Sequence, residues 1–272
     1  MHSWQEVAAG VFAGRCAELD LTVGLVLGRE RALVVDVGGD REQGAELARA
    51  VGAITAAPRE IVFTHGHFDH CFGAEAFRPA PVWAHERCAA HLGETAERQR
   101  TSWIEHYRGQ HRDEIADALA RTDVLAPDHL VTGGVELDLG GRRARLRHLG
   151  AGHTDHDLVV EVPDSSVVFA GDLVEHGAPP DFEDAVPDDW PSTVDALLGL
   201  DPAVVVPGHG DPVDPAFVRA QRDEIAAVAE IRGAFHRGAT GREGNGRGEI
   251  SEAEALRRSP YPAETTRAAL RR

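Results

Sequence analysis

The sequence predicts an α+β protein in which two successive sets of strands are each accompanied by helices. Three observations support this prediction. Short apolar, β-branched runs open the chain, at residues 11–15, 22–28 and 32–39. A segment with helical spacing follows them, at residues 41–54. Strand-like runs resume near residue 131 and are again followed by helical segments, so the second half repeats the layout of the first.

The first half is expected to be a strand meander followed by helices and further strands. The letters RERA, residues 29–32, form a turn between two of the opening strands. EIVFT, residues 60–64, predicts a buried strand, and APVWAH, residues 80–85, predicts another. Residues 86–120 are polar, rich in Ala, Glu and Arg, and largely helical in pattern. We therefore expect a helical insertion over about residues 86–128.

The second half contains two clear turns between apolar runs. DLGG at 138–141 indicates a hairpin, and PDSS at 163–166 turns the chain between two further strands. Residues 189–200 start a helix capped by Asp or Ser near a proline, and 203–210 are a strand that ends in a loop. Residues 214–235 have the spacing of an amphipathic helix.

The chain is expected to divide into one large domain and a short tail. We place the domain at residues 1–236, because strands and helices with periodic apolar patterns extend to that point. A Gly/Arg-rich linker and a short helical tail make up residues 237–272. The tail is expected to serve in packing or in contact with a partner, and the oligomeric state is left open, with a homo-oligomer allowed.

Composition and net charge indicate the cellular compartment and the classes of binding partner that we expect. The 272 residues are 42% hydrophobic and 27% charged, which is typical of a globular protein. The start has no signal-peptide pattern and no run of about 18 apolar residues occurs, so we expect a cytoplasmic protein with no membrane partner. Three widely spaced cysteines fit a reducing compartment better than a disulfide framework. A net charge of −17 opposes a nucleic acid partner, because its field repels phosphates.

The segment THGHFDHCFG concentrates four candidate metal ligands directly after a predicted strand. They are His65, His67, Asp69 and His70. Imidazole nitrogens and carboxylate oxygens bind Zn²⁺ and similar ions. Along an extended loop, alternation brings His65 and His67 to one side and leaves Asp69 and His70 facing elsewhere. The spacing therefore predicts two adjacent metal sites.

Three later strand ends supply further candidate ligands. His153 follows the strand at 142–149, Asp172 ends VVFAGD, and His209 ends VVVPGH. Glycines beside these residues permit backbone turns that aim the side chains inward. Together with the first segment, these strand ends can complete a two-metal site.

This order of motifs resembles the metallo-β-lactamase-fold hydrolase superfamily over roughly residues 7 to 215, including Asp36 in VVDVGG. The resemblance implies a four-layer αβ/βα sandwich with two mixed sheets and outer helices, and a hydrolase domain at residues 1–236. It also implies that His65, His67 and His153 hold one metal, that Asp69, His70 and His209 hold the second, and that Asp172 bridges them. Asp36 would brace the histidine loop by hydrogen bonds.

The implied chemistry is metal-dependent hydrolysis by a hydroxide held between two divalent ions, Zn²⁺ first, with Fe or Mn also accepted by these ligands. Asp69 is expected to orient the hydroxide and to pass a proton to the leaving group. The substrate would be a small-molecule ester, thioester, lactone or lactam. True β-lactamases of the superfamily commonly have Cys or Ser at the position of Asp172, which points away from them. The short tail gives no support to a glutathione thioester.

Two alternatives remain open at this stage. A mononuclear iron oxygenase resembling a persulfide dioxygenase uses the same scaffold, and a non-catalytic metal-stabilised protein would also retain the ligands. Several neighbouring residues have no assigned role. His176 is a candidate cavity residue, and Cys71 is expected to be a small buried side chain. For Trp103, His106 and Tyr107 of the insertion, a place in the core and a place in a substrate wall are weighted equally. One further set can supply a second partner to a ligand imidazole: Asp155, His156 and Asp157.

Overall fold

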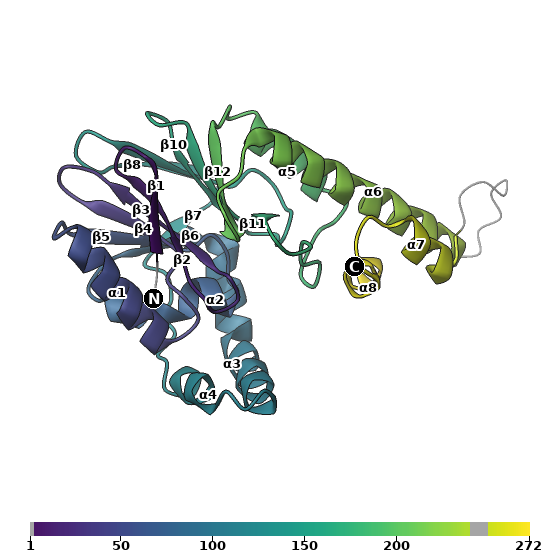
Figure 1. Ribbon diagram of the computed structural model, residues 1–272, viewed down its shortest axis with the longest axis horizontal. Helices are drawn as coiled ribbons and strands as arrows, with labels where there is room; N and C mark the ends of the chain where they lie inside the picture. Colours follow the sequence, from purple (N-terminus) through teal and green to yellow (C-terminus); the bar gives the residue numbers. More distant parts are fainter. Residues whose placement is uncertain (1–2, 240–249) are drawn as a thin grey trace.

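The computed structural model describes residues 3–239 and 250–272, and it has two mixed β-sheets (Figure 1). The strands of the first sheet lie in chain order: β1 (Ser3–Ala8), β2 (Val11–Arg15), β3 (Thr22–Leu27), β4 (Ala32–Val35), β5 (Arg59–Val62), β6 (Val82–His85) and β7 (His129–Val131). Pairing is antiparallel from β1 to β4 and parallel from β4 to β7. The parallel strands place their carboxyl ends along one edge of the sheet.

The second sheet has the order β12-β11-β10-β9-β8. Its strands are β8 (Gly134–Asp138), β9 (Arg143–Arg147), β10 (Val159–Val162), β11 (Val167–Glu175) and β12 (Val204–His209). The predicted turns DLGG and PDSS join β8 to β9 and β10 to β11, and both pairs are antiparallel. In contrast, β11 and β12 are parallel, so the strands that contain Asp172 and His209 run side by side in the same direction.

Helices cover the outer face of each sheet (Figure 1). Those beside the first sheet are α1 (Arg41–Ile54), α2 (Phe68–Cys71), the 3₁₀ helix η1 (Phe72–Phe77), α3 (Glu86–Gly109) and α4 (Asp113–Ala120). Helices α5 (Trp190–Leu198) and α6 (Pro215–Ala239) lie beside the second sheet, and α7 (Glu252–Arg258) and α8 (Ala263–Arg271) pack against α6. The predicted fold class is therefore confirmed.

Three apolar cores hold the four layers together. The central core joins the inner faces of the two sheets, with Leu33 and Leu146 among its buried members. A second core lies between the first sheet and its helices and includes Phe63 and Phe72. The third lies between the second sheet and its helices and contains Trp190, which is fully buried. Each such side chain contributes about 1.5–3 kcal/mol when fully buried.

The structure differs from the sequence-based expectation in three places. Strand β1 was not predicted, because its alternation of Trp, Gln, Glu and Val is short and half polar. Residues 68–71 form a helical turn instead of continuing an extended loop, since Phe68 packs edge-on against Phe72 of η1. Helix α6 extends to Ala239 and so includes the first residues of the predicted linker, whose remainder falls on 240–249, outside the described residues. The division at residues 236 and 237 stays a prediction.

Within residues 3–239 and 250–272, no helix combines the length and the apolar character that crossing a bilayer requires.

A close contact between two glycines fixes the histidine loop against α1. A Cβ added to Gly44 would lie 2.0 Å from the carbonyl oxygen of Gly73, and Gly73 N donates to Gly38 O at 2.8 Å. The backbone of η1 therefore lies directly on α1, and this contact sets the position of the preceding ligand segment.

We expect Gly44→Ala to lower the free energy of unfolding by about 1–3 kcal/mol, because the new methyl group must displace backbone. Gly93→Ala is the matched control. A Cβ there meets nothing within 4 Å, so better helix propensity should stabilise the protein by up to ~1 kcal/mol. Denaturant unfolding monitored by circular dichroism measures both. Equal effects of the two substitutions would contradict the close approach.

Candidate metal centre

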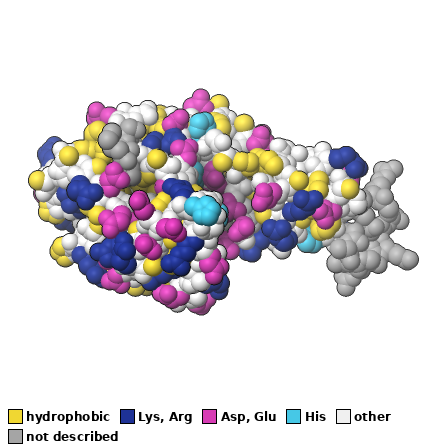
Figure 2. Space-filling view, turned by 60° about the horizontal axis from the view of Figure 1, so that its bottom comes forward, with side chains coloured by type: hydrophobic (Ala, Val, Ile, Leu, Met, Phe, Trp, Pro, Cys, Tyr) yellow, Lys and Arg dark blue, Asp and Glu magenta, His cyan; other side chains and the backbone are white. Residues whose placement is uncertain are grey.

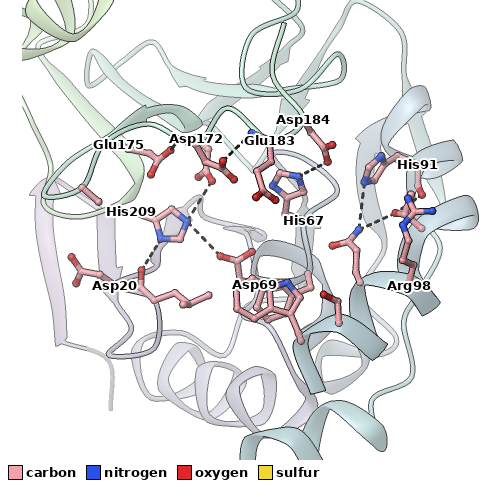
Figure 3. Close-up of a pocket in the computed structure, with 18 of the residues that line it drawn as sticks. Asp20, His67, Asp69, His91, Arg98, Asp172, Glu175, Glu183, Asp184 and His209 are labelled. Carbon is pink, nitrogen blue, oxygen red and sulfur yellow. Dashed lines mark hydrogen bonds and ion pairs between the residues drawn. The ribbon is translucent and has the colours of Figure 1, made fainter. Parts of the chain in front are cut away.

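A cavity of about 650 Å³ opens where the strand ends of the two sheets meet (Figure 3). Asp69, Asp172 and His209 lie on its floor, and its walls come from α3 and from the segment 176–184 that follows β11. Its lining includes seven acidic residues: Asp20, Asp69, Asp172, Glu175, Asp181, Glu183 and Asp184.

The first cluster consists of His65, His67, His153 and Asp172, whose ligand atoms all lie within 4.8 Å of one another. His65 Nε2 and His153 Nε2 lie 3.7 and 3.6 Å from Asp172 Oδ2. His67 presents Nδ1, which is 3.0 Å from His153 Nε2. Three histidines and a carboxylate thus converge on one small space.

The second cluster consists of Asp69, His70 and His209 and meets the same distance criterion. His209 Nε2 lies 3.4 Å from Asp69 Oδ2 and 3.4 Å from Asp172 Oδ2. His70 Nε2 lies 3.3 Å from Asp172 Oδ1. The carboxylate of Asp172 therefore stands between the two clusters. The structure brings together all seven residues that the sequence nominated, in two neighbouring groups of which the first includes Asp172.

Two buried atoms at the centre have the chemistry of metal ligands. His65 Nε2 and Asp172 Oδ1 are inaccessible to solvent, and among the described residues neither has a hydrogen bond of good geometry. A buried polar atom left without a partner costs roughly 1–3 kcal/mol. Imidazole nitrogen and carboxylate oxygen are the donors that Zn²⁺ and related ions accept, so the residues fit metal binding.

The electrostatics of the centre also demand positive charge. Burial opposes protonation of His209, yet the charge and hydrogen bond of Asp172 and the charge of Asp69 raise its pKa to about 10. Burial and the neighbouring His70 instead hold the pKa of His65 well below its ordinary value. Without metal, protons on some histidines partly balance the buried carboxylates, and cations would replace those protons.

Asp36 braces the histidine loop, as the sequence resemblance implied. Its carboxylate accepts hydrogen bonds from Thr64 N and Thr64 Oγ1, both at 2.8 Å, and its Oδ2 lies 2.8 Å from His70 Nδ1. Asp36 has φ +61°, a left-handed conformation that aims its side chain from the end of β4 toward the next strand end.

In three other ligand histidines, the ring nitrogen that faces away from Asp172 also has a polar partner. His65 Nδ1 lies 3.0 Å from Thr64 Oγ1, and His209 Nδ1 lies 2.8 Å from Leu19 O. His153 Nδ1 lies 3.2 Å from Asp181 O. Such partners fix the ring orientation and the tautomer, so that the inner nitrogen faces the metal.

Asp184 and His91 are members of the site that sequence reasoning missed. Asp184 Oδ2 lies 3.1 Å from His67 Nε2, and these two residues form a third group of candidate ligand atoms with His91 of α3. Asp184 lies in the long segment between β11 and α5, and His91 lies in the predicted insertion. No local pattern distinguishes them from other polar residues of these segments.

The other nominated residues have varied positions. His176 lines the cavity, and its Nδ1 accepts from Asp211 N at 3.1 Å. Cys71 is buried, and its thiol donates to His67 O. Trp103 lines the cavity and stacks on Phe68, whereas the buried Tyr107 donates to Glu18 and His106 is exposed.

We expected one residue of the triplet at 155–157 to contact the ring of a ligand histidine. The triplet instead contacts the backbone of the ligand loop. His156 Nε2 accepts from Gly66 N at 3.2 Å, between His65 and His67. Asp155 holds the ring of His156 at 2.8 Å, and Asp157 accepts from Thr154 N and Thr154 Oγ1.

Comparisons with known proteins agree with this geometry. A "Metallo-beta-lactamase type 2" of Bacillus cereus is 24% identical over 215 residues, which cover 76% of this chain and 73% of that protein. A protein of the same name from Bacteroides fragilis is 31% identical over 90 residues, but the match spans only 36% of it. An uncharacterized protein of Mycobacterium tuberculosis is 29% identical over 204 residues, 66% of this chain and 80% of that protein.

Among solved structures, a metallo-beta-lactamase from Pontibacter korlensis superposes with a TM-score of 0.67 at 21% identity, covering 83% of this chain and 99% of that one. At this identity the likeness shows the fold alone. The sequence model described as "Metallo-beta-lactamase superfamily" matches residues 19–209, which include all seven nominated residues. The chain belongs to the metallo-beta-lactamase superfamily.

Proposed function

We propose that this protein is a hydrolase that uses two divalent metal ions to cleave a small-molecule ester, thioester, lactone or lactam. Superfamily membership and the His/Asp cluster support a metal-dependent hydrolase in general terms. The observation on which the two-metal proposal rests is the pair of complete ligand clusters on either side of Asp172. A site for a single iron held by two histidines and an aspartate would not need the other ligands.

The proposed ligand sets follow the two clusters. His65, His67 and His153 would hold the first metal, and Asp69, His70 and His209 the second, with Asp172 between them. We favour Zn²⁺, because the donor set of nitrogens and carboxylates suits it. When bound, the ions would lower the pKa of a shared water toward about 7 and polarise the substrate oxygen.

Asp69 is the ligand to which we also assign a chemical role. Its Oδ2 faces His209 Nε2 at 3.4 Å, and the residue lines the cavity (Figure 3). A carboxylate at the boundary between ligand cluster and cavity can orient the attacking water and transfer its proton to the leaving group.

The cavity walls favour uncharged or cationic esters over anionic lactams. The lining contains acidic residues outside the two clusters, such as Asp20 and Glu183, and Arg98 is its one guanidinium among the described residues. The part of a substrate that lies against these walls, away from the ions, would therefore meet more carboxylates than guanidinium groups. The resemblance noted above also places Cys or Ser at the position of Asp172 in common β-lactamases. We consequently rank lactams last among the proposed substrates.

Metal removal and reconstitution test this proposal. We expect a chelator to abolish hydrolysis of a nitrophenyl ester and to lower the melting temperature, because metal bound to the folded state stabilises it by mass action. Activity should return with two equivalents of Zn²⁺ per chain. A demonstrably metal-free sample with full activity would refute the proposal. One Fe per chain with oxygen uptake would instead favour the oxygenase.

Asp172→Ala should reduce the bound metal from two equivalents per chain to one or none and should strongly reduce turnover, because the carboxylate between both clusters is lost. His176→Ala serves as the comparison. His176 lines the cavity without joining either cluster, so this variant should retain two equivalents. Elemental analysis after dialysis measures both. Two metals in Asp172→Ala would show that the residue does not bridge.

Asp69→Asn should separate metal binding from proton transfer, because asparagine keeps one coordinating oxygen and loses the charge. At saturating metal, we expect turnover to fall by roughly 10²- to 10⁴-fold, the usual contribution of a positioned acid or base. The loss should be smaller for a nitrophenyl ester than for an alkyl ester, whose leaving group needs a proton. An equal loss for both would limit Asp69 to ligation and orientation.

A further inference from the structure

The segment from Asp181 to Ala185 contacts two histidines of the first cluster from outside. His67 Nε2 lies 3.1 Å from Asp184 Oδ2, and His153 Nδ1 lies 3.2 Å from Asp181 O. These two histidines follow strands of different sheets, β5 and β9. A single short segment therefore orients rings that reach the cluster from both halves of the fold.

Asp184 determines which nitrogen of His67 faces the cluster. His67 directs Nε2 to the carboxylate and Nδ1 to His153. A carboxylate accepts a proton but donates none when ionised, so it keeps the proton on Nε2 and leaves the lone pair of Nδ1 free for a metal.

Arg272, which follows α8, and Arg232 of α6 hold this segment in place. Arg272 donates from Nε to Ala185 O at 3.0 Å and from Nη2 to Asp184 O at 3.3 Å. The carbonyl oxygen of Arg272 in turn accepts from Arg232 of α6 at 2.5 Å. These contacts come from the helices that extend to one side of the body of the molecule (Figures 1 and 2).

An apolar contact reinforces the same connection. Phe182 is fully buried, with its ring centroid 5.2 Å from that of Trp190 and 6.1 Å from that of Tyr261, just before α8. Trp190 lies 5.8 Å from the ring of His153. A series of ring contacts therefore connects Tyr261, next to α8, with His153 of the first cluster.

A separate cation site is the competing explanation for the group formed by His67, His91 and Asp184. The direct contact between His67 Nε2 and Asp184 Oδ2 already satisfies both atoms. A nitrogen of His91 lies within 4.8 Å of both residues, but His91 Nε2 also lies 3.4 Å from the amide nitrogen of Gln99. The geometry thus favours a hydrogen bond over a third metal.

We propose that Asp184 is a positioning residue for the first cluster, and that Arg272 maintains its position by holding the backbone of residues 184 and 185. This proposal rests on the two-metal function proposed above. It assigns a role at the metal centre to Arg272, which directly follows α8 and lies outside the 19–209 region matched by the superfamily model.

The test measures Zn²⁺ affinity by competition with a chromophoric chelator, in the absence of substrate. We expect Asp184→Ala to weaken the affinity by about 10- to 100-fold, the usual effect of losing an outer partner of a ligand histidine. Asp184→Asn should recover most of this loss, because its amide oxygen still accepts from Nε2. If long-range attraction of the cation were the cause, Asn would be as weak as Ala.

A double-mutant cycle shows whether Asp184 acts through His67. In a His67→Ala background, Asp184→Ala should cause no further loss of affinity, because the ring that it orients is absent. An additive loss would overturn the proposal. Loss of a third equivalent of Zn²⁺ in Asp184→Ala would likewise overturn it and assign the group as a separate cation site.

Matched control variants test the role of the contact between Arg272 and the backbone of residues 184 and 185, which we call the clamp. Arg272→Ala should weaken Zn²⁺ binding by several-fold, whereas Arg267→Ala, in helix α8 that Arg272 follows and paired with Glu252 at 2.8 Å, should leave it unchanged. Asp195→Asn, an exposed carboxylate paired with Arg222, is the control for Asp184. Equal affinities of the two arginine variants would refute the clamp.

Unfolding of the metal-free forms shows that each variant folds. Because zinc affinity is measured without turnover, a protein that binds two metals but cleaves no ester would contradict the proposed function and leave the role of Asp184 intact. Unchanged affinity in Asp184→Ala would contradict that role alone.

Discussion

The rest of the site depends on the burial of one carboxylate, that of Asp172. Its side chain is 6% exposed and lies within 3.7 Å of ring nitrogens from His65, His70, His153 and His209. An isolated buried charge would cost several kcal/mol, so the fold must place cationic groups or metal around it. This requirement explains why ligands that follow or end three other strands, β5, β9 and β12, converge on the one residue that β11 places at their centre.

Close backbone packing makes this convergence possible. A Cβ at Gly208 would lie 1.8 Å from Asp172 Oδ1, so β12 can approach the carboxylate only with glycine at that position. Gly171 adopts φ +55° against Thr64, and Leu158 N donates to Thr64 O at 2.7 Å. The two sheets are therefore joined directly at the residue that precedes the first ligand. The rigidity of the centre follows from this junction as much as from the ligands.

The parts of the site that sequence could predict are those written in short-range patterns. His65 follows an apolar strand, Asp172 follows an apolar run, and the spacing of the first motif separates the ligands into two sets. The strand that contains Asp172 was expected to end there, but β11 continues to Glu175. The turn at 68–71 was not predictable in this way, because it forms through packing of Phe68 against Phe72 and Trp103. Asp184 and its holder Arg272 are set by tertiary contacts across 117 and 88 residues, for which no local periodicity exists.

The same division separates chemistry from specificity. The ligands lie at strand ends, where sheet geometry dictates the backbone, so metal chemistry can be inferred from the fold and the donor set. The cavity walls come from α3 and from the segment after β11, whose polar side chains face the cavity without any constraint from the sheets. Because Asp181 and Asp184 in that segment also hold ligand histidines, changes that alter substrate fit there would act on the metal as well. We therefore expect substitutions on the α3 wall, at positions such as Arg98 and Ser102, to affect metal binding less than substitutions on the wall that the C-terminal helices hold.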